Sequence, residues 1–176
     1  SAKRFVIATG ARPFVPPIKG IQEIPYLTSD TVWGLTEVPQ RLVVLGGGPI
    51  GAELTQVFAR LGSKVTEVEM LHCLLSREDP EAGCLIRDRF QKEGIEVLVN
   101  AKAVEMRQGP TGHELVVAHP QDGEKIIPFD QILIAVGRAP NITGLDLDKA
   151  GVKHSKKGID VDDYLRTSAK HIFACG

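Results

Sequence analysis

The chain has 176 residues, an ordinary apolar content and a formal net charge of −1 at pH 7, with acidic and basic residues mixed along its length. This length suits one domain, or one domain together with pieces of another. The near-neutral charge, without a basic tail, argues against nucleic-acid binding, and no apolar stretch is long enough to cross a bilayer. Three scattered cysteines without a C-x-x-C pair indicate reduced thiols in the cytoplasm and no metal site.

The first forty residues predict a strand and an extended connector. Arg4–Ala8 is an apolar strand, and Thr9–Gly10 forms the turn after it. Ala11–Pro25 contains four prolines, which favour an extended chain over a helix. Ser29–Asp30 is expected to cap a short helix that runs to Leu35.

The next thirty residues predict a strand, a glycine loop, a helix and a second strand. Leu42–Leu45 is typical of a strand buried on both faces of a parallel sheet. A G-x-G-x-x-G motif follows, then a helix that Gly62 ends, then a strand over Val65–Glu69. The apolar stripe of the helix is expected to contain Ile50, Leu54, Val57, Phe58 and Leu61.

This stretch has the features of a dinucleotide-binding unit. Gly46 permits the tight turn, Gly48 lets a pyrophosphate approach the backbone, and Gly51 lets the helix pack close to the strand. Pro49 suits the first helical turn, whose free N–H groups attract phosphate. A P-loop is rejected because Ala and Glu follow the last glycine where Lys and Ser or Thr are needed. The remaining alternative is a glycine-rich turn in another α/β protein.

Glu69 lies 18 residues after Gly51, close to the spacing at which an acidic residue takes the ribose hydroxyls. The same carboxylate would repel the 2′-phosphate of NADP by about 1 kcal/mol in water and about 4 kcal/mol at an effective dielectric of 20. Because Met70–His72 supplies no Arg or Lys, the sequence predicts NAD rather than NADP.

The rest of the chain predicts a second helix, further strands and an antiparallel meander. The helix starts at Asp79–Pro80 and ends at Gly94, and Ile95–Val99 continues a β-α-β-α-β order that favours parallel strands. Leu85, Ile86 and Phe90 are expected on one face of this helix. Further strands are predicted at Ala103–Gln108, Glu114–His119, Lys125–Phe129, Gln131–Val136, Gly158–Val161 and His171–Ala174.

Four motifs in order resemble those of the pyridine nucleotide–disulfide oxidoreductases, a family of flavoproteins. Ala8–Gly10 resembles the A-T-G turn, and Gly46–Glu53 resembles the NAD fingerprint. Ala135–Asn141 is similar to the G-R-x-P-N turn, and Ile172–Gly176 is similar to the I-F-A-x-G-D segment without its Asp. The resemblance covers nearly the whole chain, and it is strongest to the dihydrolipoamide dehydrogenase and mercuric reductase branch.

The resemblance implies an enzyme in which NAD(P)H passes hydride to FAD, and the electrons continue to a cysteine pair and a substrate. It places Gly46, Gly48, Pro49, Ile50, Gly51, Glu53, Glu69, Val136 and Gly137 at NAD(H), and Thr9, Gly10 and Arg138 at FAD. As alternatives, Glu53 is a solvated helix residue and Arg138 a surface turn residue.

The expected fold is α/β: a Rossmann-like three-layer domain with a parallel sheet and an antiparallel meander, flanked by remnants of a flavin domain. We expect residues 41–140 to be the NAD(P)-binding domain, 1–40 the end of the flavin domain with its connector, and 141–176 the return segment. The chain lacks C-x-x-x-x-C, a flavin-domain glycine motif and an interface domain. It is therefore expected to be an excised piece that binds NAD(H) but not FAD, and is inactive alone. The parent is expected to be a homodimer, with the flavin and interface domains as this piece's own partners.

Two other functions are alternatives to the flavin-dependent one. A flavin-independent dehydrogenase is disfavoured because neither Tyr26 nor Tyr164 has a Lys four residues later. A non-enzymatic NAD-sensing module stays open. Glu67 is expected at a rim or in an ion pair, because a buried unpaired carboxylate is costly. The two terminal strands, separated from their sheet, are expected to pair within the chain, to bind a second copy, or to be poorly ordered.

Overall fold

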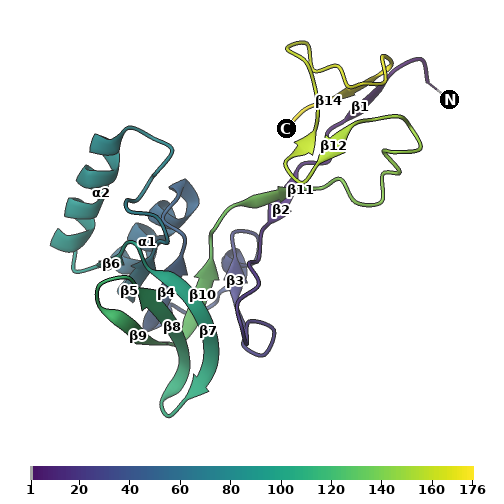
Figure 1. Ribbon diagram of the computed structural model, residues 1–176. Coiled ribbons are helices and arrows are strands. Elements are labelled where there is room, and N and C mark those ends of the chain that lie inside the picture. Colours follow the sequence, from purple (N-terminus) through teal and green to yellow (C-terminus); the bar gives the residue numbers. More distant parts are fainter. Residues whose placement is uncertain (1) are drawn as a thin grey trace. The chain divides into compact units, whose positions relative to one another are not determined.

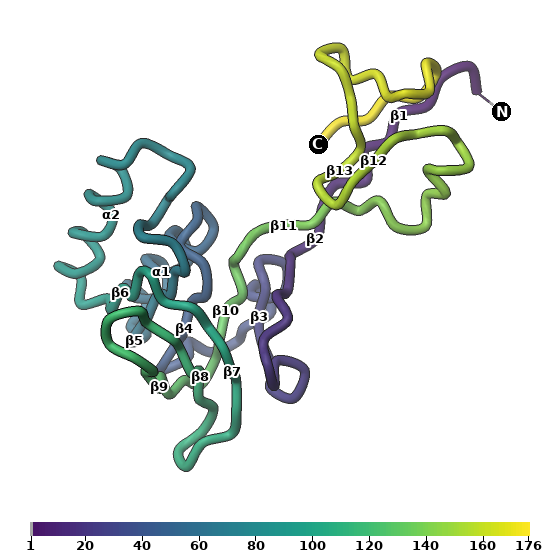
Figure 2. Tube along the Cα trace, in the orientation of Figure 1, coloured from purple at the N-terminus to yellow at the C-terminus, as the bar shows by residue number. Residues whose placement is uncertain are grey.

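The computed structural model describes residues 2–176, which form two compact units (Figures 1 and 2). The central unit is Pro13–Gly137, and the flanking unit combines the chain up to Arg12 with Arg138–Gly176. The connector therefore packs with the central unit from Pro13 onward. Whether the flanking unit belongs to a flavin domain stays a prediction. Within residues 2–176, no helix is long and apolar enough to cross a membrane.

The central unit is built on a five-stranded sheet in which every neighbouring pair is parallel. The strands occur in the order β3 (Leu27–Thr28), β10 (Gln131–Ile134), β4 (Arg41–Leu45), β5 (Lys64–Val68) and β6 (Glu96–Leu98). The apolar runs of the three inner strands, β10, β4 and β5, are buried on both faces, as the sequence predicts for a parallel sheet.

Two helices pack on one face of this sheet: α1 (Pro49–Arg60) and α2 (Pro80–Lys92). Leu54, Phe58 and Phe90 fill the space between the helices and the strands. The buried apolar stripes of α1 and α2 are narrower than the sequence predicts, because Val57, Leu61 and Leu85 are 47, 59 and 69% exposed. At 100° per residue these three positions fall outside the sheet-facing side of their helices.

A three-stranded antiparallel meander packs on the opposite face of the sheet. It consists of β7 (Lys102–Gly109), β8 (Gly112–His119) and β9 (Gly123–Phe129). Leu115 and Phe129 meet Val43 and Ile132 of the sheet, and Ile21 and Ile24 of the connector join the same core. The predicted three-layer architecture is confirmed.

The flanking unit contains three small strand pairs. β1 (Phe5–Ile7) pairs in parallel with β14 (Ile172–Ala174), so the terminal strands pair within the chain, which is the first of the three expectations for them (Figure 1). The other pairs are β2 (Ala11–Pro13) with β11 (Arg138–Pro140), and β12 (His154–Ser155) with β13 (Gly158–Ile159). Leu147, Val152 and Ile172 form its small buried core.

The helix expected after Ser29–Asp30 is instead a single 3₁₀ turn, η1 (Val32–Gly34), with Thr31 at its start. The Thr31 hydroxyl accepts from the Thr28 N–H at 2.9 Å, so it closes the preceding turn and does not cap the helix. The prediction of a capped helix was wrong because the segment is too short for one.

Candidate nucleotide-binding site

The carboxyl ends of β4 and β10 mark the point where the strand order of the sheet reverses. From β4 the chain proceeds through α1 to β5 and β6 on one side, whereas β10 and β3 lie on the other side. In open α/β sheets, ligands bind in the crevice at such a switch point. The glycine loop leaves β4 here, and Val136–Gly137 follows β10.

Two of the three motif glycines are required by the chain itself. A Cβ added to Gly51 would lie 1.8 Å from the carbonyl oxygen of Gly46, so only glycine lets α1 pack this close to the loop. Gly46 has φ of +109°, and a Cβ there would lie 2.6 Å from the carbonyl oxygen of Ala135. These two results confirm the tight turn and the close packing inferred from the sequence.

Gly48 is different, because the protein leaves room for a side chain at this position. Its φ is −77°, which every residue can adopt, and a Cβ would meet nothing within 4 Å. Gly48 is the N-cap of α1, no side chain caps the helix, and Pro49 is its first residue. A helix start of this kind, with free first-turn N–H groups and no side-chain cap, is a candidate site for a phosphate.

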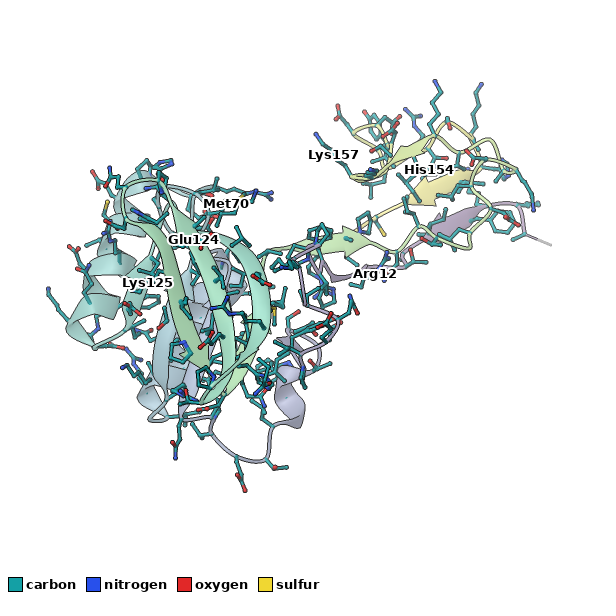
Figure 3. The ribbon with its side chains drawn as sticks, turned by 60° about the horizontal axis from the view of Figure 1, so that its bottom comes forward. Arg12, Met70, Glu124, Lys125, His154 and Lys157 are labelled. Carbon is teal, nitrogen blue, oxygen red and sulfur yellow. The ribbon has the colours of Figure 1, made fainter. Side chains whose placement is uncertain are left out.

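Glu69 is tied directly to this loop. Its Oε2 accepts a 2.6 Å hydrogen bond from the Gly47 N–H, and its Oε1 accepts a 2.7 Å bond from the Leu71 N–H. The Leu75 N–H donates to the Gly47 carbonyl at 2.8 Å, and buried Leu74 packs against Gly47. The segment after β5 thus holds the carboxylate beside the start of α1, and Met70, the next residue, is exposed (Figure 3).

The other residues predicted for NAD(H) lie in the same unit. Val136 is 38% exposed, and its backbone N would lie 2.9 Å from a Cβ on Gly46, so the segment after β10 borders the glycine loop. Gly137 has φ of +128°, Ile50 is half-buried, and Glu53 is exposed on the second turn of α1. Either role considered for Glu53 is compatible with this exposure.

In the flanking unit, Asn141, which the sequence analysis did not single out, bonds to Thr9 and Gly10, and Arg138 bonds to the next residue, Ala11. Thr9 Oγ1 donates to the Asn141 carbonyl at 2.7 Å, and the Asn141 side chain donates back to the Thr9 carbonyl at 3.0 Å. The Asn141 N–H donates to the Gly10 carbonyl, and the Arg138 guanidinium donates to the Ala11 carbonyl. The Asn of the quoted G-R-x-P-N turn was the signal that could have revealed this role.

Arg12 completes the same network (Figure 3), because its guanidinium donates to the Asn141 side-chain oxygen at 3.2 Å. A cavity of about 200 Å³ lies in the flanking unit and is lined by Thr9, Gly10, Lys157 and Cys175 together with apolar side chains. Of the residues expected at FAD, Thr9 and Gly10 line this cavity and Arg138 does not.

Glu67 departs from its expectation. It lies on β5, is 0% exposed, and neither carboxyl oxygen has a hydrogen-bond partner among residues 2–176. The pKa of Glu67 is raised to about 8, mainly by burial and also by the charge of Glu69, while the nearby Thr55 hydroxyl acts in the opposite direction. The prediction of a rim or paired position was wrong: the group avoids the cost of a buried charge by staying protonated at neutral pH.

Comparison with known proteins identifies the family. The family model of pyridine nucleotide-disulphide oxidoreductases matches residues 1–176. The chain belongs to this family. Among its relatives, it is 40% identical to a mercuric reductase of Staphylococcus aureus over 100% of the chain and 32% of the relative. It is also 40% identical to a dihydrolipoyl dehydrogenase of Thermus scotoductus, over 99% of the chain and 38% of the relative.

A solved structure shows the same fold. The flavoprotein disulfide reductase RclA from Escherichia coli, solved as a Cu(II) complex, superimposes with a TM-score of 0.86 at 34% identity. The match covers 99% of this chain and 40% of RclA. The chain spans about a third of the length of the curated relatives it matches. The relatives named here are oxidoreductases of this family.

Proposed function

We propose that the central unit binds NAD(H), with the pyrophosphate on the loop from Gly46 to Gly51 and the adenosine ribose on Glu69. Gly48 carries this proposal. Its backbone needs no glycine, a side chain there would meet nothing within 4 Å, and the position is the uncapped start of α1. A ligand that approaches the backbone closely is a physical reason for a glycine there.

The hydrogen bonds of Glu69 support its proposed role in binding the ribose. Each oxygen accepts one backbone N–H, which fixes the carboxylate and leaves further acceptor capacity for hydroxyl groups. The same fixed negative charge disfavours a 2′-phosphate. We therefore propose NAD(H) as the preferred nucleotide, with Ile50, Glu53, Val136 and Gly137 toward the nicotinamide end.

For the protein that contains this chain, we propose an FAD-dependent oxidoreductase similar to dihydrolipoamide dehydrogenase or mercuric reductase. When bound, FAD would accept hydride from NAD(P)H and pass electrons on to a disulfide or related acceptor. Thr9, Gly10 and Arg138 would hold FAD from the flanking unit, together with flavin and interface domains of the same protein. A cytoplasmic homodimer belongs to the same proposal, and the unpaired thiols of Cys73, Cys84 and Cys175 fit a reducing compartment.

Parallel calorimetric titrations of the chain with NADH, NADPH and FAD test the proposal. NADH binding with weaker NADPH binding and no FAD binding is the expected result. Glu124→Gln, which changes an exposed carboxylate on β9, is the matched control and should bind NADH like the unchanged chain. A folded chain that binds neither nicotinamide nucleotide would overturn the proposal for this unit, and tight FAD binding would overturn the division between the two units.

A further inference from the structure

Glu67 lies beneath the candidate nucleotide site and is not explained by it. It sits on the helix-facing side of β5, two residues before Glu69, so the two side chains follow the same face of the strand. Val44 of β4 and Val97 of β6 are its register partners in the neighbouring strands. A carboxyl group thus occupies a place that is otherwise apolar.

The environment of Glu67 contains one polar group and one charge. Thr55 of α1 is 0% exposed, and its hydroxyl has no hydrogen-bond partner in the described chain, as is also true of both Glu67 oxygens. The core on this side of the sheet receives apolar side chains from α1, α2, β4 and β6. The charged group that acts on Glu67 is Glu69, whose oxygens are held at the glycine loop.

Thr55 and Glu67, whose side-chain oxygens have no hydrogen-bond partner among the described residues, lie on α1 and β5, the two elements that build the site. Thr55 lies on α1, one turn beyond Gly51, and Glu67 leads into the carboxylate that Gly47 binds. When protonated, Glu67 can donate a hydrogen bond to a hydroxyl group, and the Thr55 hydroxyl is the polar group near it. When ionised, it adds a second negative charge behind Glu69 and the bound phosphates.

We propose that Glu67 is a positioning residue of the nucleotide site: its neutral carboxyl links β5 to α1 through Thr55, and its ionisation weakens nucleotide binding. This inference rests on the proposed NAD(H) site. It adds a dependence of NAD(H) affinity on pH, because loss of the Glu67 proton in the core opposes the binding of the anionic nucleotide at the surface.

The sign of the effect follows from reciprocity. The charge of Glu69 favours the neutral form of Glu67, so an ionised Glu67 must disfavour negative charge at Glu69 and at a pyrophosphate beside it. NADH affinity is therefore highest where Glu67 is protonated and falls as pH rises through its titration. The charge of ionised Glu67 lies in the protein interior, where it is only partly screened, so it should weaken NADH binding about tenfold.

Calorimetric titration of the chain with NADH at half-unit steps from pH 7 to pH 9.5 tests the inference. We expect the dissociation constant of the unchanged chain to rise about tenfold across this range. Glu67→Gln keeps the shape and the hydrogen-bond donor, so it should bind like the unchanged chain at pH 7 and lose the rise. Thr55→Val removes the proposed partner of the neutral carboxyl, so it should weaken NADH binding at pH 7, while the rise of the dissociation constant with pH persists.

The outcomes are distinguishable. An alkaline rise that persists in Glu67→Gln comes from another group and overturns the inference. A flat profile in the unchanged chain also overturns it. If Glu67→Gln fails to fold, Glu67→Leu supplies the same charge-free comparison. Failure of every folded variant to bind NADH at pH 7 overturns the proposed function itself, whereas pH-independent binding at pH 7 and 9.5 overturns the role of Glu67 alone.

Discussion

The N–H of Gly47 donates a 2.6 Å hydrogen bond to Oε2 of Glu69, so the glycine loop and the carboxylate after β5 are one structural unit. A change at Glu69 therefore has two separable effects. It removes a negative charge near the ribose, and it leaves the Gly47 and Leu71 N–H groups without their acceptor. Variants that differ only in charge or only in hydrogen bonding separate these contributions.

Glu69→Ala is expected to lower the preference for NADH over NADPH about tenfold, because about 1.4 kcal/mol of charge repulsion disappears. Glu69→Gln keeps an acceptor for one of the two N–H groups and also loses the charge, so it should change the preference similarly with a smaller loss of NADH affinity. Parallel titrations with both nucleotides measure these ratios. An unchanged ratio in both variants would contradict the proposed role of the charge.

The two loop glycines Gly48 and Gly51 should respond oppositely to alanine. Gly51→Ala places a methyl group 1.8 Å from a backbone oxygen and should lower the free energy of unfolding by about 3 kcal/mol. Gly48→Ala meets nothing within 4 Å, so its stability should change by less than about 1 kcal/mol, while NADH affinity falls. Denaturant unfolding and NADH titration report the two quantities. Normal NADH binding by Gly48→Ala would show that no ligand approaches there.

The buried carboxyl group also predicts a dependence of stability on pH. The pKa of Glu67 is raised from 4.5 to about 8 on folding, so its stabilising contribution is complete below pH 4.5 and is lost as pH rises through 8. The loss is about 1.4 kcal/mol per pH unit within this window. Glu67→Gln should therefore gain stability relative to the unchanged chain between pH 5 and pH 8, measured by urea unfolding. Parallel stability profiles would show that Glu67 is ionised throughout.

Asn141 predicts a local effect in the flanking unit. Asn141→Ala removes the side-chain bonds to the Thr9 carbonyl and from Arg12, each contributing about 1 kcal/mol. Because these bonds join the turn after β1 to the segment after β11, amide exchange should accelerate around Gly10 and Asn141. Amides of β4 and β5 in the central unit are the internal control and should keep their protection. Equal acceleration in both units would mean that Asn141 supports the whole chain.

The carboxylate of Glu93 joins the two helices and predicts behaviour in acid. Arg60, Arg89 and Gln56 all donate to it, and hydrogen bonding from Arg60 is the main reason that its pKa is lowered to about 2. A lowered pKa contributes stability above pH 4.5 that is lost as pH falls toward 2. Glu93→Gln should thus flatten the acid limb of the urea midpoint against pH, while Glu124→Gln leaves it unchanged.

Residue patterns predicted the architecture because each layer follows a simple period. The start of α1 at Pro49 and the positive φ of Gly62 and Gly94 agree with the proline and glycine signals in the sequence. The tight turn at Gly46 and the close approach at Gly51 follow from local chain geometry. These features depend on near neighbours, so a single sequence suffices to find them.

The features that were missed depend on long-range packing. Leu85 is apolar but lies outside the side of α2 that meets the sheet. Ile86 and Phe90 lie on that side and pack in the core. The cost of a buried unpaired charge predicted a rim or an ion pair for Glu67, but protonation removes most of that cost. Asn141 acts across a sequence separation of 132 residues to Thr9, so its place in the G-R-x-P-N turn marks it but does not reveal its partner.

The 2.9 Å hydrogen bond from the Phe14 N–H to the Gly137 carbonyl closes the central unit at its own two ends. Strands β1 and β14, which pair with each other, lie on the chain before and after this closure. Once the central unit has folded, the effective loop between the two strands is therefore short, and the entropy cost of bringing them together falls. The central unit should accordingly fold first, with β1–β14 pairing as the later and slower event in refolding.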